Sequence, residues 1–178
     1  MVRMAAQSGY IRVSIVPIGE VGEDVLLPLR DGLEEVLDLE VKLGKATSLP
    51  ESAHDRGRGQ YVSTALLVLL RTAPGELLLG VVDVDLYARS LRFVFGEADP
   101  PHGVAVVSVR RLREGYYGRA EDEALFRMRA LKEAVHELGH LFGLGHCQDA
   151  RCVMHFSNSL EDTDIKGYGY CQRCQGKA

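Results

Sequence analysis

An eleven-residue segment, His136 to His146, constrains the fold of this chain more than any other feature. Its sequence, H-E-L-G-H-L-F-G-L-G-H, places His140 four residues after His136. Four residues advance an α-helix by about 400°, so these two side chains project from nearly the same face, one turn apart. Two imidazoles at that spacing can bind one metal ion. The spacing therefore predicts a helix that carries both histidines toward a shared ligand.

A glycine near the end of this segment explains how the third histidine joins the first two. Gly143 follows His140 by three residues, and a glycine there can take the left-handed conformation that ends a helix and reverses the chain. His146 would then return as a third ligand from outside the helix. Three protein ligands leave a fourth position for water, which is the arrangement of a catalytic zinc site and not of a closed structural one.

Glu137 has the position of a general base in this arrangement. It points about 100° away from His136, beside the ion, where it can reach a zinc-bound water. The zinc would activate that water and polarise a peptide carbonyl, while Glu137 takes the proton and passes it to the leaving amine. The short H-E-x-x-H pattern also occurs by chance in ordinary helices. Five defined positions in one window favour the zinc site.

Four cysteines follow the histidines in two closely spaced pairs, C-x4-C and C-x2-C: Cys147, Cys152, Cys171 and Cys174. Four thiolates can enclose one tetrahedral zinc and exclude substrate, so we expect a second, structural zinc, making two per chain. Two disulfides, a redox-active C-x2-C pair and an iron–sulfur cluster are the alternatives. The polar segment from Ser157 to Tyr170 cannot fold on apolar burial alone, which favours a metal that holds this tail in place.

The cellular compartment of the protein decides whether its cysteines are expected to form disulfides. Met1 to Gly9 lacks the apolar region of a secretory signal, and the longest apolar run, Ala65 to Leu70, is too short to span a membrane. We therefore expect a cytoplasmic protein, in which structural disulfides are rare. The net charge of −4 gives no general attraction to nucleic acid or to an anionic membrane.

The segment from His136 to Cys174 resembles the metzincin signature H-E-x-x-H-x-x-G-x-x-H. With the cysteines that follow, it looks like the archaemetzincin family of zinc metallopeptidases. By that resemblance Met154 is the methionine of the turn beneath the metal. His155 is expected near the ligands or the substrate cleft. Tyr168 or Tyr170 could either hydrogen-bond a reaction intermediate or pack on the cysteine site.

The order of the expected elements predicts an α+β fold. It consists of a mixed, twisted sheet of about five strands, with helices packed on one face. Apolar spacing places strands at residues 10–17, 39–43, 76–84, 91–95 and 103–109, and helices at 24–37 and 121–141. Residues 61–72 fit either a helix or a buried strand, and the stop signal Pro74-Gly75 that follows favours a helix. Residues 45–59 are polar and read as a surface loop. We expect one catalytic domain, 1–178, with an upper part (1–145) and a small zinc-held lower part (146–178).

The resemblance also suggests how substrate binds. Metzincin folds place an antiparallel edge strand above the zinc, and a peptide adds to it as a further strand. By position this strand is expected at Leu91 to Phe95. Because the first expected strand begins near Tyr10, a pro-segment has no room, so short peptides or chain termini are the expected substrates. The alternative is a weakly catalytic, zinc-stabilised module that binds a peptide on the edge strand. A monomer is compatible with the sequence.

Overall fold

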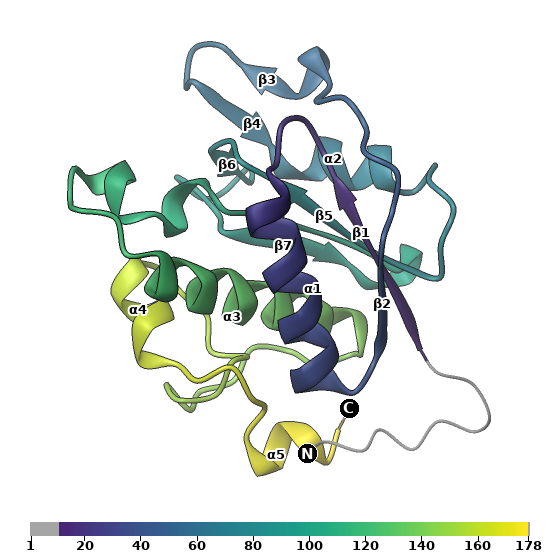
Figure 1. The fold of residues 1–178 in the computed structure, drawn as a ribbon, viewed down its shortest axis with the longest axis vertical. Coiled ribbons are helices and arrows are strands. Elements are labelled where there is room, and N and C mark those ends of the chain that lie inside the picture. Colours follow the sequence, from purple (N-terminus) through teal and green to yellow (C-terminus); the bar gives the residue numbers. More distant parts are fainter. Residues whose placement is uncertain (1–10, 178) are drawn as a thin grey trace.

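A five-stranded mixed sheet forms the centre of the computed structural model, which describes residues 11–177 (Figure 1). The start of the expected first strand, Tyr10, lies outside the described residues. The strand order is β2-β1-β5-β8-β7, in which the first four strands are parallel and β7 pairs antiparallel with β8. The strands are β1 (Arg12–Pro17), β2 (Glu40–Leu43), β5 (Leu77–Val82), β7 (Gly96–Asp99) and β8 (Val104–Ser108). The predicted α+β class and the antiparallel edge strand are confirmed.

Helices cover both faces of this sheet, so the expectation that they would pack on one face is wrong. On one side lie α1 (Glu23–Leu37) and α3 (Glu123–Leu141), and on the other side lies α2 (Ser63–Leu70). Successive residues of a strand point to opposite faces. In β8, for example, Val107 packs in the core beneath α3 and Val106 in the core beneath α2. Strands buried on both sides require apolar residues at every position.

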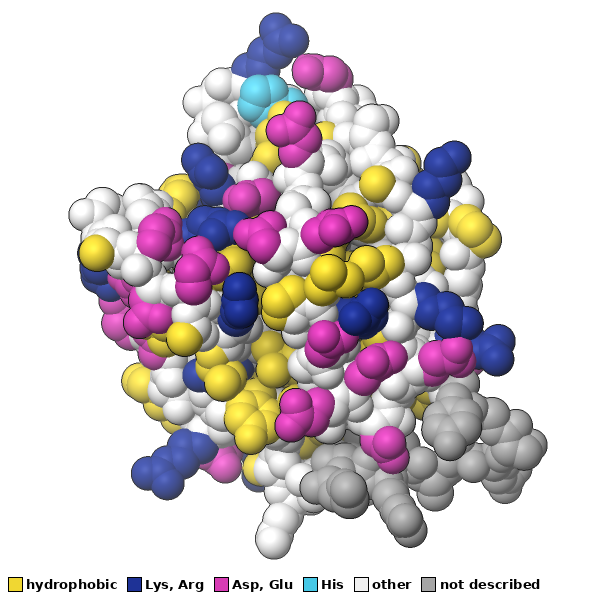
Figure 2. Space-filling view, in the orientation of Figure 1, with side chains coloured by type: hydrophobic (Ala, Val, Ile, Leu, Met, Phe, Trp, Pro, Cys, Tyr) yellow, Lys and Arg dark blue, Asp and Glu magenta, His cyan; other side chains and the backbone are white. Residues whose placement is uncertain are grey.

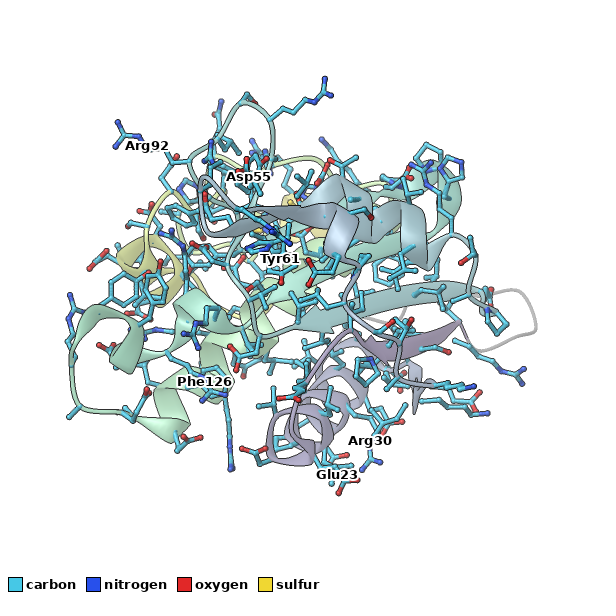
Figure 3. All side chains as sticks on the ribbon, turned by 90° about the horizontal axis from the view of Figure 1, so that it is seen from above. Glu23, Arg30, Asp55, Tyr61, Arg92 and Phe126 are labelled. Carbon is cyan, nitrogen blue, oxygen red and sulfur yellow. The ribbon has the colours of Figure 1, made fainter. Side chains whose placement is uncertain are left out.

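A second, three-stranded sheet takes its first strand from residues 45–59, which were expected to form a surface loop. It consists of β3 (His54–Asp55), β4 (Gln60–Val62) and β6 (Leu86–Tyr87). Arg58, in the turn between β3 and β4, donates hydrogen bonds to the carbonyl of Arg92 at 2.9 Å and of Leu91 at 3.4 Å. Figure 3 shows Asp55 and Arg92 at the same end of the molecule. The hairpin is thereby fastened to residues 88–95.

The edge strand lies later in the chain than predicted, because residues 91–95 do not form it. Within this stretch Val94 makes one isolated bridge, to Leu86. The Arg92 carbonyl is bonded instead to the side chains of Arg58 and Gln60, so it cannot join a ladder. Pairing with β8 is regular from Gly96, and β7 is the antiparallel edge strand of the main sheet, at the opposite edge from β2.

Buried polar side chains attach the C-terminal segment to α3. This segment contains the short helices α4 (Leu160–Ile165) and α5 (Gln172–Gln175), which Figure 1 shows beside and below α3. Arg129 donates to both Asp164 and Glu114, and Lys166 pairs with Glu133 at 2.9 Å. The tail is thus held to α3 by paired charges.

The surface carries charges of both signs. Figure 2 shows acidic and basic side chains interspersed around an apolar strip on the face that carries α1. Within residues 11–177, no helix has both the length and the apolar character needed to cross a membrane.

Candidate metal centres

The helix α3 carries the first two histidines as the sequence predicted. It begins after Asp122, whose side chain accepts a hydrogen bond from the Leu125 backbone N–H at 2.9 Å. It ends at Leu141, and Gly143 follows with φ of 84°. That left-handed conformation, which favours glycine, turns the chain back. His146 is thereby brought beside the helix.

The three histidines converge on one point. The possible ligand atoms of His136, His140 and His146 all lie within 4.8 Å of one another. Nδ1 of His136 lies 2.7 Å from the Val153 carbonyl, and Nδ1 of His140 lies 2.8 Å from the Leu144 carbonyl. Because a carbonyl accepts only, both Nδ1 atoms carry the proton.

The remaining nitrogens fit a metal ion. The Nε2 atoms of His136 and His140 face each other at 3.1 Å. Each is an unprotonated acceptor, so they cannot bond to one another, and a cation between them resolves this arrangement. Nitrogens about 2.0–2.1 Å from a tetrahedral zinc lie roughly 3.3 Å apart, close to the separation found here. The carbonyls that fix the tautomers are the partners that orient metal-binding histidines.

The surroundings of the three imidazoles favour their neutral form. Burial holds the pKa of His136 well below the ordinary histidine value, and it lowers the pKa of His140 and His146 as well. Lys166 adds to the effect for all three. A neutral imidazole is the form that binds a metal.

Glu137 is buried directly beneath the edge strand. A Cβ atom at position 96 would lie 2.5 Å from its Oε1 atom, so Gly96 lets β7 pass close over the carboxyl group. Burial raises the pKa of Glu137 well above the ordinary glutamate value, and the charge of Glu133 raises it further. A divalent cation nearby would lower that pKa again. Burial and a bound cation therefore shift the pKa of this carboxyl group in opposite directions.

A cleft of about 520 Å³ opens above these groups. Its floor contains His136, Glu137 and His140, and one wall is formed by β7. The upper rim comes from residues 88–95, which contribute Ala88, Leu91 and Val94. The floor of the cleft thus holds the histidine site and the candidate base together.

The four cysteines form a second candidate site. The sulfur atoms of Cys147, Cys152, Cys171 and Cys174 all lie within 4.8 Å of one another. The 147–171 and 152–174 sulfur pairs are each 3.8 Å apart. Four sulfurs about 2.3 Å from a tetrahedral zinc would lie about 3.8 Å apart, whereas a disulfide needs about 2.05 Å. Hydrogen bonding from the Cys174 backbone lowers the pKa of Cys171 to about 7, which favours a thiolate.

The two sites share a short stretch of backbone. Cys147 follows His146 in the chain, and its N–H donates to the Met154 carbonyl at 2.8 Å. His155 Nδ1 lies 3.0 Å from the carbonyl of Cys147. His155 therefore supports the backbone between the two ligand sets, and no ligand role is needed for it.

Met154 and Tyr170 support the helix from below. Met154 is fully buried and its sulfur contacts Gly139, between the two helical histidines. The hydroxyl of Tyr170 donates to the Val135 carbonyl at 3.1 Å. Tyr168 is 50% exposed, and neither tyrosine lines the described cleft. Packing, and not contact with substrate, is the role that the structure gives Tyr170.

Sequence reasoning missed the ion pair of Glu133 and Lys166. The two side chains are 3% and 0% exposed, and Thr163 donates a further hydrogen bond to Glu133 at 2.9 Å. Glu133 precedes Glu137 by one helical turn, which is a weak signal. Nothing in the polar tail distinguishes Lys166 from a surface lysine.

Known proteins resemble the chain over most of its length. Residues 36–178 match the profile of peptidase family M54. Archaemetzincin from Pyrococcus furiosus is 45% identical, covering 93% of this chain and 91% of that protein. The crystal structure of archaemetzincin from Archaeoglobus fulgidus, complexed with malonate, superposes with a TM-score of 0.85 at 38% identity, covering 94% of this chain and 100% of that one. A zinc-dependent peptidase from Methanocorpusculum labreanum superposes with a TM-score of 0.84 at 29% identity, covering 93% and 98%.

Proposed function

The chain belongs to peptidase family M54, the archaemetzincins, and is a zinc metallopeptidase; we propose that His136, His140 and His146 bind its catalytic zinc and that Glu137 is the general base. The observation that carries this proposal is the position of Glu137. Its carboxyl group lies in the floor of the cleft beside the histidines and beneath an edge strand. A purely structural metal site has no use for a proton acceptor there.

The histidines, Glu137 and two backbone carbonyls have different roles in the proposed hydrolysis. His136, His140 and His146 would hold a zinc ion, which would supply a water that ionises near neutral pH and a Lewis acid for the carbonyl. Glu137 takes the proton from the attacking water and delivers it to the leaving nitrogen. The carbonyls of Val153 and Leu144 hold His136 and His140 in the required tautomer.

The edge strand gives the substrate a place to bind. The Ser108 N–H donates to the Phe95 carbonyl at 2.7 Å. Because bonded residues alternate along an antiparallel pair, Gly96 and Ala98 turn their backbone groups away from β8. A peptide can hydrogen-bond to these groups as an added strand. The cleft of about 520 Å³ can hold a peptide segment of a few residues, and short peptides or chain termini are the proposed substrates.

The cysteine site is proposed to hold a second, structural zinc. Its four thiolates would leave no position for substrate. The site joins the backbone after His146 to α5, so it would fix the third histidine as well as the tail. Two zinc ions per chain follow from this assignment.

The test is to compare Glu137→Gln with Glu123→Gln, a change at an exposed glutamate of the same helix. At matched zinc content, Glu137→Gln should slow the hydrolysis of a peptide library by at least about two orders of magnitude, the usual scale for losing an acid–base group. Glu123→Gln should behave like the parent. Equal turnover in both variants, from preparations free of other peptidases, would refute the assignment of the base.

A further inference from the structure

Glu97 is a second carboxylate at the cleft, in the middle of the edge strand. It pairs with Val106 of β8, which packs in the core beneath α2. Residues paired across strands point to the same face, so the Glu97 side chain lies on the α2 side. The neighbouring Gly96 faces Glu137 on the α3 side. Glu137 of α3 and the side chain of Glu97 thus lie on opposite sides of β7.

Two hydroxyl groups at the start of α2 hold the Glu97 carboxylate in place. Ser63 donates to Oε2 at 2.5 Å, and Thr64 contacts both oxygens at 3.1 Å. Ser63 is fully buried. Oε1 therefore has Thr64 as its one hydrogen-bond partner among the described residues. An ionised carboxylate can accept about four hydrogen bonds, so acceptor positions remain free. The group is therefore oriented and can still accept hydrogen bonds from a ligand.

The charge of Glu97 has no cationic partner among residues 11–177. Glu97 and Glu137 are acidic, and no lysine or arginine lines the cleft. Two residues further along β7, Asp99 differs in this respect because Arg71 and His102 both contact it. Arg58 is occupied by the carbonyl groups of residues 91 and 92, and Arg92 points outward into solvent in Figure 3.

The register of an added strand decides which substrate side chain meets Glu97. A residue directly opposite Glu97 would project to the α2 side, and its two neighbours would project to the other face. Opposite charges in such cross-strand pairs attract each other. We propose that Glu97 is a specificity-determining residue that selects peptides with lysine or arginine at the one position opposite it. This inference rests on the proposed function, in which the peptide adds to β7.

The experiment uses peptides with one cleavable bond, in which a single lysine is moved along the sequence and replaced by norleucine in the matched controls. For the zinc-loaded protein, kcat/KM for lysine over norleucine should reach about fivefold at one position, the upper range for a cross-strand charge pair. The two flanking positions should show no such preference. In 0.5 M salt the ratio should shrink, because an ion pair at the surface is screened.

Two variants distinguish a specific effect of Glu97 from the overall negative electrostatic potential of the cleft. Glu97→Gln should bring the ratio close to one. Asp99→Asn, which removes the same formal charge from the same face of β7, should retain it. Binding supplies a readout without turnover: in the Glu137→Gln background the lysine peptide should bind about fivefold more tightly than the norleucine peptide, and adding Glu97→Gln should remove the difference.

The outcomes distinguish this inference from the proposed function. Hydrolysis of the norleucine peptides with no lysine preference at any position would overturn the role of Glu97 and leave the peptidase intact. A preference that survives Glu97→Gln would also overturn it. If no peptide is cleaved, the proposed function fails, and the binding comparison still decides whether Glu97 recognises a cationic side chain.

Discussion

Lys166→Met should destabilise the protein by leaving Glu133 buried without its cation. The Lys166 side chain is 0% exposed and that of Glu133 is 3% exposed, so water cannot replace the lost partner. Breaking a buried pair on one side costs about 3–5 kcal/mol. For a chain of this size, that corresponds to a fall in Tm of about 6–20 °C. The hydrogen bond from Thr163 remains and only partly compensates.

The magnitude is checked by urea unfolding of the parent and the variant at equal zinc content. The double change Glu133→Gln with Lys166→Met is the matched control, because it removes both charges and keeps a group that Thr163 can bond. We expect the double variant to recover most of the loss. A loss below about 1 kcal/mol in Lys166→Met would refute the reasoning, as would a double variant no more stable than the single one.

Three further predictions concern the cleft and the two proposed metal sites. Gly96→Ala should reduce kcat about 10- to 100-fold in a peptide assay, because its Cβ would displace Glu137; unchanged kcat would show that the close approach is unimportant. Cys171→Ser should lower the Tm and the zinc content together, since binding of a structural zinc is folding free energy; an unaltered Tm at one zinc fewer would contradict the structural role. Protein carrying one equivalent of zinc, which fills the cysteine site and leaves the histidines free, should lose stability as the pH falls below about 6.5, because burial lowers the pKa of His136 and the unfolded chain then binds more protons. Urea unfolding at pH 7.5 and 5.5 measures this, and His136→Leu should weaken the dependence; an equal dependence in both would contradict the assignment.

Local patterns were sufficient to predict that the three histidines converge. Helical spacing placed His136 and His140 on one face, and the turn at Gly143 is found with its left-handed backbone. Both properties depend on residues within a few turns of each other. The convergence of the cysteines was predicted from their two short spacings. Those spacings could not indicate that the cysteine site lies next to the histidine site in the folded protein.

Features that depend on distant parts of the chain were missed. The apolar runs of β5 and β8 indicate strands buried on both faces, yet the expected fold covered one face. Residues 91–95, four of which are apolar, were read as a strand, but Arg58, more than thirty residues earlier, donates a hydrogen bond to the Arg92 carbonyl. The pairing of Lys166 with Glu133 likewise depends on how the tail packs against α3.

The zinc dependence of hydrolysis tests the central claim most directly. Chelator-treated protein is titrated with zinc while bound zinc, peptide hydrolysis and near-ultraviolet circular dichroism are followed together. Four thiolates bind zinc more firmly than three neutral imidazoles with an open position. The first equivalent should therefore restore tertiary structure without activity, and the second should bring hydrolysis in proportion to occupancy. Glu137→Gln should bind both equivalents and remain inactive. Full activity at one zinc per chain, or none at two, would contradict the account.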